Sequence, residues 1–158
     1  MNTRFKDYLQ TLTPKRRDIA MEAVDEYLKG ESENIQFVNT ATKIYNLCHD
    51  LALEEVEHAE VILMRQNYKL IKRVRIASGG ITETFFDIRL ILKEALLANA
   101  TIIAMVHNHP SGSIRPSKFD DELTLNAKKA CDVMRIHLAD HVIIADGAYY
   151  SYREQGRI

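Results

Sequence analysis

The most informative segment of the chain lies between a short apolar run and a long helical pattern, and it reads His107-Asn108-His109-Pro110-Ser111-Gly112-Ser113-Ile114-Arg115-Pro116-Ser117-Lys118-Phe119-Asp120. His107 and His109 are two residues apart at the end of a predicted strand, so their side chains point to the same face. A loop shaped by proline and glycine follows, and Asp120 then lies one turn into the next helix. Two imidazoles and one carboxylate can fill three positions of a tetrahedral zinc ion and leave the fourth to water. Such an open position is typical of a catalytic site rather than a structural one.

Each part of this pattern also has a purely structural explanation. Two histidines separated by one residue are common in polar loops at the surface. Ser117 followed three residues later by Asp120 fits a capping box at the start of a helix. The two interpretations are compatible, because a helix N-terminus holds Asp120 rigidly and favours its anionic, metal-binding form. The metal hypothesis therefore depends on the complete spacing and not on any single pair.

The segments on either side predict an α/β (α+β) fold, with a mixed β-sheet flanked by helices. The expected strands are short and apolar or alternating, and they cover residues 61–64, 70–76, 102–106, 142–145 and 149–152. The expected helices begin near capping residues, and they cover about residues 14–30, 40–51, 87–99 and 117–137. We expect a short N-terminal helical extension, residues 1–50, followed by one domain, residues 51–158.

Length and composition are those of an ordinary globular protein. The chain has 158 residues, of which 46% are hydrophobic and 27% charged, so it can bury a core without disulfides. Cys48 and Cys131 lie in apolar helical patterns and are expected to be buried free thiols. The chain lacks an apolar run of the ~18 residues that a membrane span needs, and its start lacks an apolar signal core. We therefore expect a soluble, cytoplasmic protein with no membrane partner.

The net charge of −1 disfavours tight binding of nucleic acid by the isolated chain. A basic run at residues 69–75 is the exception, and such a run is usually a solvated face of a strand. Nucleic acid is therefore a disfavoured partner of the isolated chain.

The spacing of the central segment resembles the metal-binding motif of the JAMM (JAB/MPN) metallopeptidases, which is His-x-His, seven residues, Ser, two residues, Asp. Here seven residues separate His109 from Ser117, and Asp120 follows at the required distance. Residues 107–112 are more specifically similar to the hexapeptide of the RadC branch. Further similarity lies on both sides of the motif, at residues 94–96, 99–100, 140–144 and 150–154. The resemblance covers roughly residues 50–158.

This resemblance implies a zinc-dependent metallopeptidase with a cytidine-deaminase-like mixed sheet. His107, His109 and Asp120 would hold one Zn²⁺ per chain, and Ser117 would donate a hydrogen bond to the developing oxyanion or the bound water. The family also uses a glutamate just before the first core strand as general base, and its register falls on Glu57. Three other nearby glutamates are expected to be solvated: Glu54, Glu55 and Glu60.

The remaining histidines near the motif are interpreted as surface or structural groups. His58 is expected at the surface, whereas His137, near a helix end, and His141, at a strand start, are expected to be structural. The chain also departs from the RadC pattern, since Ile88-Arg89-Leu90 stands where that family usually has Pro-Arg-Glu. The first 50 residues carry no helix-hairpin-helix signature of DNA binding.

Four functions fit these residues. The first is a zinc hydrolase of peptide or isopeptide bonds, with Glu57 as general base. The second is an accessory protein of DNA repair or recombination, as the RadC name suggests. The third is a metal-binding interaction module without turnover. The fourth is a non-haem Fe²⁺ site, because two histidines and a carboxylate also form a facial triad; Ser117 and the glutamate favour zinc hydrolysis over iron.

Overall fold

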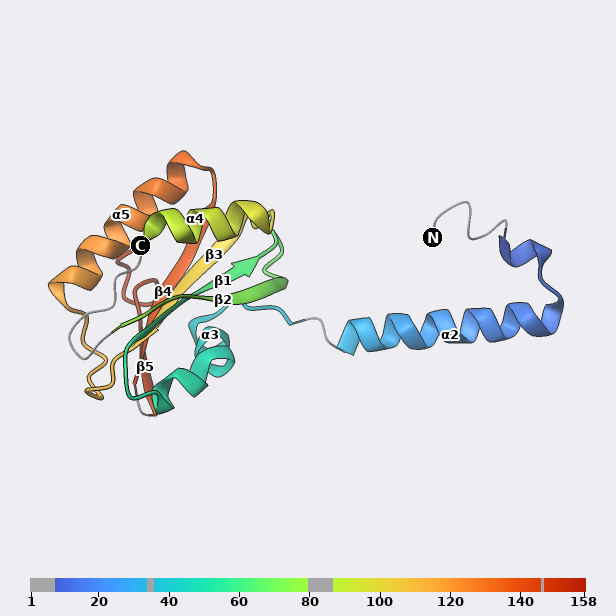
Figure 1. The fold of residues 1–158 in the computed structure, drawn as a ribbon, viewed down its shortest axis with the longest axis horizontal. Helices are drawn as coiled ribbons and strands as arrows, with labels where there is room; N and C mark the ends of the chain where they lie inside the picture. The colour runs from blue at the N-terminus through green and yellow to red at the C-terminus, as the bar shows by residue number, and fades with distance from the viewer. Residues whose placement is uncertain (1–7, 34–35, 80–86, 146) are drawn as a thin grey trace. The chain divides into compact units, whose positions relative to one another are not determined.

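The computed structural model describes residues 8–33, 36–79, 87–145 and 147–158 (Figure 1). The chain divides into two compact units, Met1–Gln36 and Phe37–Ile158. The first unit contains helix α2 (Pro14–Glu33), which begins at the predicted proline but continues through Gly30 rather than ending there. The second unit holds every strand of the sheet and all of the residues predicted to bind a metal.

The Phe37–Ile158 unit is built around a five-stranded mixed sheet, which confirms the predicted α/β fold class. Its strands are β1 (His58–Met64), β2 (Leu70–Ser78), β3 (Ile102–Asn108), β4 (His137–Ala145) and β5 (Ala148–Ser151). They are arranged in the order β2-β1-β3-β4-β5. β3 and β4 are parallel, and the other neighbouring pairs are antiparallel. The parallel pair requires a crossover, which helix α5 (Lys118–Val133) provides.

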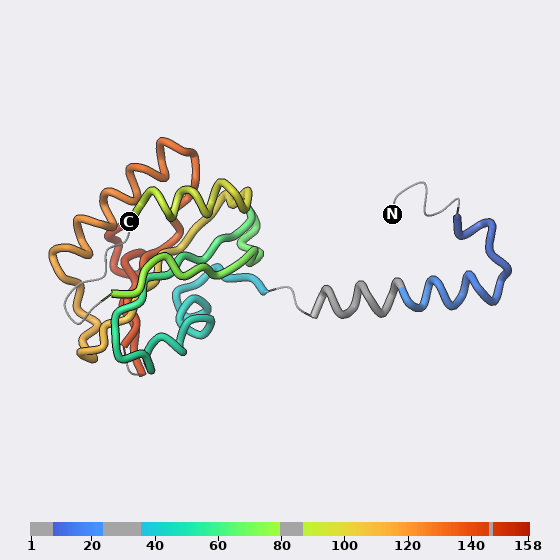
Figure 2. Tube along the Cα trace, viewed as in Figure 1, coloured from blue at the N-terminus to red at the C-terminus, as the bar shows by residue number. Residues whose placement is uncertain are grey.

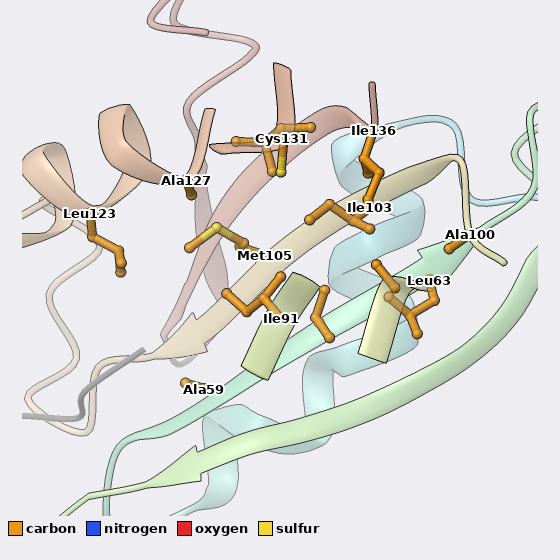
Figure 3. Close-up of a cluster of buried hydrophobic side chains, with 13 residues drawn as sticks. Ala59, Leu63, Ile91, Ala100, Ile103, Met105, Leu123, Ala127, Cys131 and Ile136 are labelled. Carbon is orange, nitrogen blue, oxygen red and sulfur yellow. The ribbon is translucent and has the colours of Figure 1, made fainter. Parts of the chain in front are cut away.

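Helices cover both faces of this sheet (Figures 1 and 2). Helices α4 (Ile88–Leu97) and α5 pack on one face, and α3 (Ala41–Cys48) with the 3₁₀ helix η1 (His49–Leu53) packs on the other. Figure 3 shows Ile91 and Cys131, from α4 and α5, gathered with Ile103 and Met105 of β3. Strands β1 and β3 are buried along their whole length, which explains why their sequences are apolar on both faces.

The second unit begins at Phe37, before the boundary at residue 50 that the sequence analysis expects. The physical reason is that α3 and η1 belong to the core of this unit. Ala41, Ile44 and Cys48 pack in one buried cluster with the β1 and β3 residues on the face of the sheet that α3 covers. Cys48 and Cys131 are buried free thiols, as predicted, and they lie on opposite faces of the sheet.

Several element boundaries also differ from the prediction. β1 begins at His58, so the strand includes His58, Ala59 and Glu60. α5 ends at Val133, and His137 begins β4 instead of ending the helix. The predicted β4–β5 hairpin is present, with Gly147 at a positive φ of 70°; Asp146, the other residue of its turn, lies outside the described residues, as does Gly80. In the described ranges, none of the helices has the length and apolar character of a membrane span.

Candidate metal centre

Strand β3 and the residue just after it supply two of the three predicted ligands. His107 lies in β3 on the same face as Met105, because side chains two residues apart in a strand point the same way. His109 lies just beyond the end of the strand, where its backbone N–H donates to the carbonyl of Ile144 in β4 at 2.9 Å. The Nε2 atoms of the two histidines are 3.0 Å apart.

Asp120, in the first turn of α5, completes the group. Its Oδ1 atom lies 3.1 Å from Nε2 of His107, and its Oδ2 atom lies 3.6 Å from Nε2 of His109. One ligand atom from each of the three residues lies within 4.8 Å of the others, so the group could hold one metal ion. The structure therefore brings together all three residues that the sequence predicts as ligands.

The position of Asp120 is fixed by the capping box that its spacing from Ser117 predicts. The Ser117 hydroxyl accepts from the backbone N–H of Asp120 at 3.1 Å, and both the backbone N–H and the hydroxyl of Ser117 donate to Asp120 Oδ2 at 2.7 Å. Burial acts to raise the pKa of Asp120, but hydrogen bonds with His107, His109 and Ser117 outweigh it and hold the pKa well below its ordinary value. Asp120 is therefore an anion in this site.

The loop after β3 determines which nitrogen of His109 faces the site. Gly112, at a positive φ of 79°, turns the chain so that the carbonyl of Ser113 lies 2.7 Å from His109 Nδ1. A carbonyl only accepts, so in the neutral ring Nδ1 carries the proton and Nε2 presents its lone pair, whereas in the protonated ring Nε2 also donates. Burial acts to lower the pKa of His109, but hydrogen bonds to Asp120 and to this carbonyl, with the charges of Asp120 and Glu57, raise it.

Glu57 lies directly before β1, at the edge of the sheet where His107 and His109 lie. Ala59 pairs with His107 in the β1–β3 register, and Glu57 is the residue just before β1, two residues from Ala59. The charge of Glu57 is one of the influences that raise the pKa of His109. Of the four candidate glutamates, Glu57 is thus the one whose charge acts on a predicted ligand, and its role as general base stays a prediction.

The other glutamates lie elsewhere, and the prediction that Glu60 is solvated is wrong. Glu60 is only 3% exposed and forms ion pairs with Arg73 and Arg75 of β2. It belongs to the opposite face of β1 from Ala59, because consecutive residues of a strand alternate between its two faces. Glu54 is partly exposed and pairs with Arg75 at 3.3 Å, and Glu55 is exposed.

Comparison with known proteins identifies the family of this chain. The RadC-like JAB domain family matches residues 38–157. The chain belongs to this family. The JAB domain is 42% identical over 108 residues to a UPF0758 protein of Porphyromonas gingivalis, covering 68% of this chain and 46% of that protein. A UPF0758 protein of Haemophilus ducreyi is 33% identical over 135 residues, covering 85% of this chain and 60% of that protein. The chain thus spans about half the length of the curated relatives it matches.

The JAB domain buries His58, which the sequence analysis expects at the surface. His58 is 6% exposed, and its Nδ1 atom lies 2.8 Å from the hydroxyl of Ser78 in β2. Its backbone N–H donates to Asn108 Oδ1 at 2.7 Å, while Asn108 Nδ2 donates to the carbonyl of Val56 at 3.0 Å. The side chain of Asn108, between the two predicted ligand histidines, therefore holds the backbone on both sides of Glu57.

His141 of the JAB domain is structural, as expected, but it also contacts a predicted ligand. Its Nε2 atom lies 2.9 Å from His107 Nδ1, and its Nδ1 atom lies 2.6 Å from the hydroxyl of Thr124. Burial lowers the pKa of His141 well below its ordinary value, so its ring is neutral. His137, in contrast, is exposed at the start of β4.

The sequence analysis assigns Asn108, Thr124 and His141 no role beside the predicted ligands, although the sequence contains an indication of each. Asn108 and His141 are buried polar residues within strands that are mostly apolar. Thr124 lies four residues after Asp120 and therefore on the same side of α5. The β3–β4 register, which the sequence does not reveal, is what brings His141 beside His107.

Proposed function

We propose that this JAB domain is a zinc-dependent hydrolase of peptide or isopeptide bonds. The observation that carries the proposal is the convergence of His107, His109 and Asp120 on one point, with Glu57 near enough for its charge to raise the pKa of His109. Two imidazoles and a carboxylate are zinc ligands that leave a coordination position for water, which is the arrangement of hydrolytic zinc sites.

The chemistry of the donor set fits such an ion. The Ser113 carbonyl directs the lone pair of His109 Nε2 into the site, where it lies 3.0 Å from His107 Nε2. The Asp120 carboxylate lies against both rings. Three electron-rich atoms at such short distances are stabilised by a cation between them. Fe²⁺ would accept the same residues, but an acidic residue near the ligands favours zinc, because hydrolysis needs a group that accepts a proton.

Glu57 is the proposed general base. A bound zinc ion would polarise the substrate carbonyl and lower the pKa of a water molecule. Glu57 would accept the proton that this water loses on attack and deliver it to the leaving amine. The two hydrogen bonds that Asn108 makes to Val56 and His58 support this role, because they hold the backbone of Glu57 against the strand that carries His107.

Ser117 is proposed to assist at the developing oxyanion. Its hydroxyl donates to Asp120 Oδ2 in this structure, so donation to an oxyanion requires the proton to rotate away from that carboxylate. Ser117 also positions Asp120, and this role does not depend on the rotation, because it is the backbone N–H of Ser117 that donates to the carboxylate. An oxyanion donor is worth about 2.7–4 kcal/mol of transition-state stabilisation in other hydrolases.

The DNA-accessory function has less support from this unit. The basic run in β2 is largely paired with carboxylates: Lys72 with Glu94, Arg73 with Asp50 and Glu60, and Arg75 with Glu54 and Glu60. Paired side chains contribute little to the counterion release that drives non-specific binding. Titration with duplex and single-stranded DNA at physiological salt tests this. Dissociation constants tighter than about 10⁻⁶ M would favour the DNA role.

The test of the hydrolase proposal has two stages. Elemental analysis of protein purified without added metal should give about one zinc ion per chain, and His109→Ala should abolish it. The zinc-loaded protein is then screened against mixed peptides and isopeptide-linked peptides. Absence of metal from the wild-type protein contradicts the metal centre. Bound zinc without cleavage of any peptide favours the alternative of a metal-binding interaction module.

A further inference from the structure

A chain of three hydrogen bonds connects α5 to the metal centre through the interior of the domain. It begins at Thr124, whose hydroxyl donates to the backbone carbonyl of Asp120 at 2.6 Å. A threonine hydroxyl has one proton, and a carbonyl only accepts. The same hydroxyl must therefore act as acceptor toward His141 Nδ1, which lies 2.6 Å away. The direction of the first bond thus requires a proton on Nδ1 of His141.

The direction of the hydrogen bond between His141 and His107 follows from the protonation state of His141. This residue is 0% exposed, and an imidazolium is costly in such surroundings, so the ring carries a single proton. With that proton on Nδ1, Nε2 of His141 is an acceptor. His107 Nδ1, 2.9 Å away, must then be the donor. A proton on Nδ1 of His107 leaves the lone pair on Nε2, the atom that faces His109 and Asp120.

The ring of His141 is held in this orientation from the C-terminal side of the domain. Tyr152 stacks on it with ring centroids 5.0 Å apart and an interplanar angle of 8°. The Tyr152 hydroxyl donates to Asp121 Oδ1 at 2.8 Å, and the Arg157 guanidinium lies over the Tyr152 ring, 5.1 Å from its centroid. The imidazole is thus fixed both by its hydrogen bonds and by stacking.

We propose that Thr124 and His141 are positioning residues that keep His107 in the tautomer whose Nε2 atom can bind the metal ion. Neither residue is a ligand, and each acts through its neighbour. The inference rests on the metal site of the proposed function, but it does not depend on hydrolysis. Groups of this kind, which bind the second nitrogen of a ligand histidine, typically contribute 10–100-fold to metal affinity.

Thr124→Val tests the proposal, because it preserves the shape of the side chain and removes the hydroxyl. His141 then loses its acceptor at Nδ1, and the tautomer of both rings is no longer fixed. Zinc affinity, measured by competition with a colorimetric chelator, should fall about 10–100-fold. Thr124→Ser restores the hydroxyl and should recover most of this loss. Thr101→Val is the matched control, because Thr101 is exposed at the opposite end of β3, and it should bind zinc like the wild type.

Nuclear magnetic resonance on the wild-type protein gives a second test that needs no variant. Long-range ¹H–¹⁵N correlation should find the His141 proton on Nδ1. A ¹⁵N–¹⁵N coupling should connect His107 Nδ1 to His141 Nε2 through their hydrogen bond. A proton on Nε2 of His141, or zinc affinity unchanged in Thr124→Val, would overturn the proposal. These outcomes are distinct from failure of the metal site itself, which would appear as wild-type protein that binds no zinc.

Discussion

At the residue scale, a histidine binds a metal ion only through a nitrogen that carries no proton, so the partner of its other nitrogen matters as much as its position. His109 has a backbone carbonyl at Nδ1, supplied by Ser113 in the loop that Gly112 turns. His107 has a second histidine at Nδ1. The two ligands are therefore oriented by unrelated parts of the chain, one local and one distant in sequence.

Glu57→Gln separates a catalytic role from a role in metal binding. Glutamine has nearly the same shape but cannot accept the proton, so hydrolysis should fall by about 10²–10⁴-fold. Zinc content should stay at the wild-type level, because the ligand group comprises His107, His109 and Asp120. Rates are measured on a peptide from the cleavage screen, with zinc determined by elemental analysis of the same samples.

Two further variants complete the comparison. Glu55→Gln, at an exposed position, should leave both the rate and the zinc content unchanged. Glu60→Gln removes charged partners of Arg73 and Arg75 and should lower the free energy of unfolding by about 1–3 kcal/mol. A wild-type rate in Glu57→Gln, with loss of cleavage in Glu55→Gln, would show that the base is a different glutamate.

The raised pKa of His109 predicts the pH dependence of zinc binding. A protonated His109 cannot present Nε2, so protons compete with the metal ion as pH falls through this pKa. Because the shift is upward, apparent affinity should begin to fall above the ordinary histidine pKa of about 6.5. Asp120, with its lowered pKa, remains ionised throughout this range. Chelator competition between about pH 8 and pH 5.5 checks this. A zinc affinity that does not change between about pH 8 and pH 6 would contradict the prediction.

The grouping of His107, His109 and Asp120 can be predicted from the sequence because their motif is local, but the groups around them cannot. The capping box of Ser117 and Asp120 depends only on a spacing of three residues. Burial of Glu60 and His58 depends on the β1–β2 pairing, which supplies Arg73, Arg75 and Ser78 as partners. Such long-range pairing is not encoded in any short pattern, so both residues are expected at the surface from the sequence alone.

At the scale of single elements, two helices end in the same way but only one end is predicted. α4 and α5 both terminate in a pair of backbone bonds typical of a Schellman motif, with Asn99 at a φ of 50° and Arg135 at 54°. Asparagine tolerates this left-handed conformation, and its presence predicts the end of α4. Arginine carries no such signal, so the predicted helix continues to His137.

Arg135→Gly should therefore stabilise the domain. A left-handed conformation costs an ordinary residue about 1–2 kcal/mol, and glycine adopts it without that cost. Greater freedom of glycine in the unfolded chain offsets part of the gain, so the free energy of unfolding should rise by about 0.5–1 kcal/mol. Asn99→Gly is the matched control and should give a smaller gain. Urea denaturation of the three proteins measures the difference, and destabilisation by Arg135→Gly would contradict the prediction.

At the scale of the whole molecule, the sheet carries two separate buried clusters, one on each face, and the predicted metal ligands belong to neither. The order of helices and strands is predictable from hydrophobic periodicity and capping residues. The extent of the second unit is not, because α3 looks like part of an N-terminal helical extension until its packing against β3 and β4 is known. The spacing of Ile44 and Leu51 fits a helix of a separate extension as well as a helix that packs on the sheet.

Metal removal should leave the domain folded. The three predicted ligands belong to neither apolar cluster, and the two clusters hold the sheet and helices together without a metal. Chelated protein should keep its circular dichroism spectrum and unfold cooperatively. Added zinc should raise the free energy of unfolding only through ligand linkage, by about 2.7 kcal/mol at a free zinc concentration 100 times the dissociation constant. Unfolding on chelation, as in a zinc finger, would contradict this expectation.

The predicted ligands lie within residues 107–120, whereas the segment around Glu57 reaches them across a separation of about fifty residues. Closing the short loop between ligands costs little chain entropy, and closing the long one costs more. A partly unfolded molecule can therefore still chelate a metal ion after it has lost the geometry for proton transfer. Bound zinc is for this reason a weak indicator of native protein, and a preparation is better judged by the environment of residues 56–58.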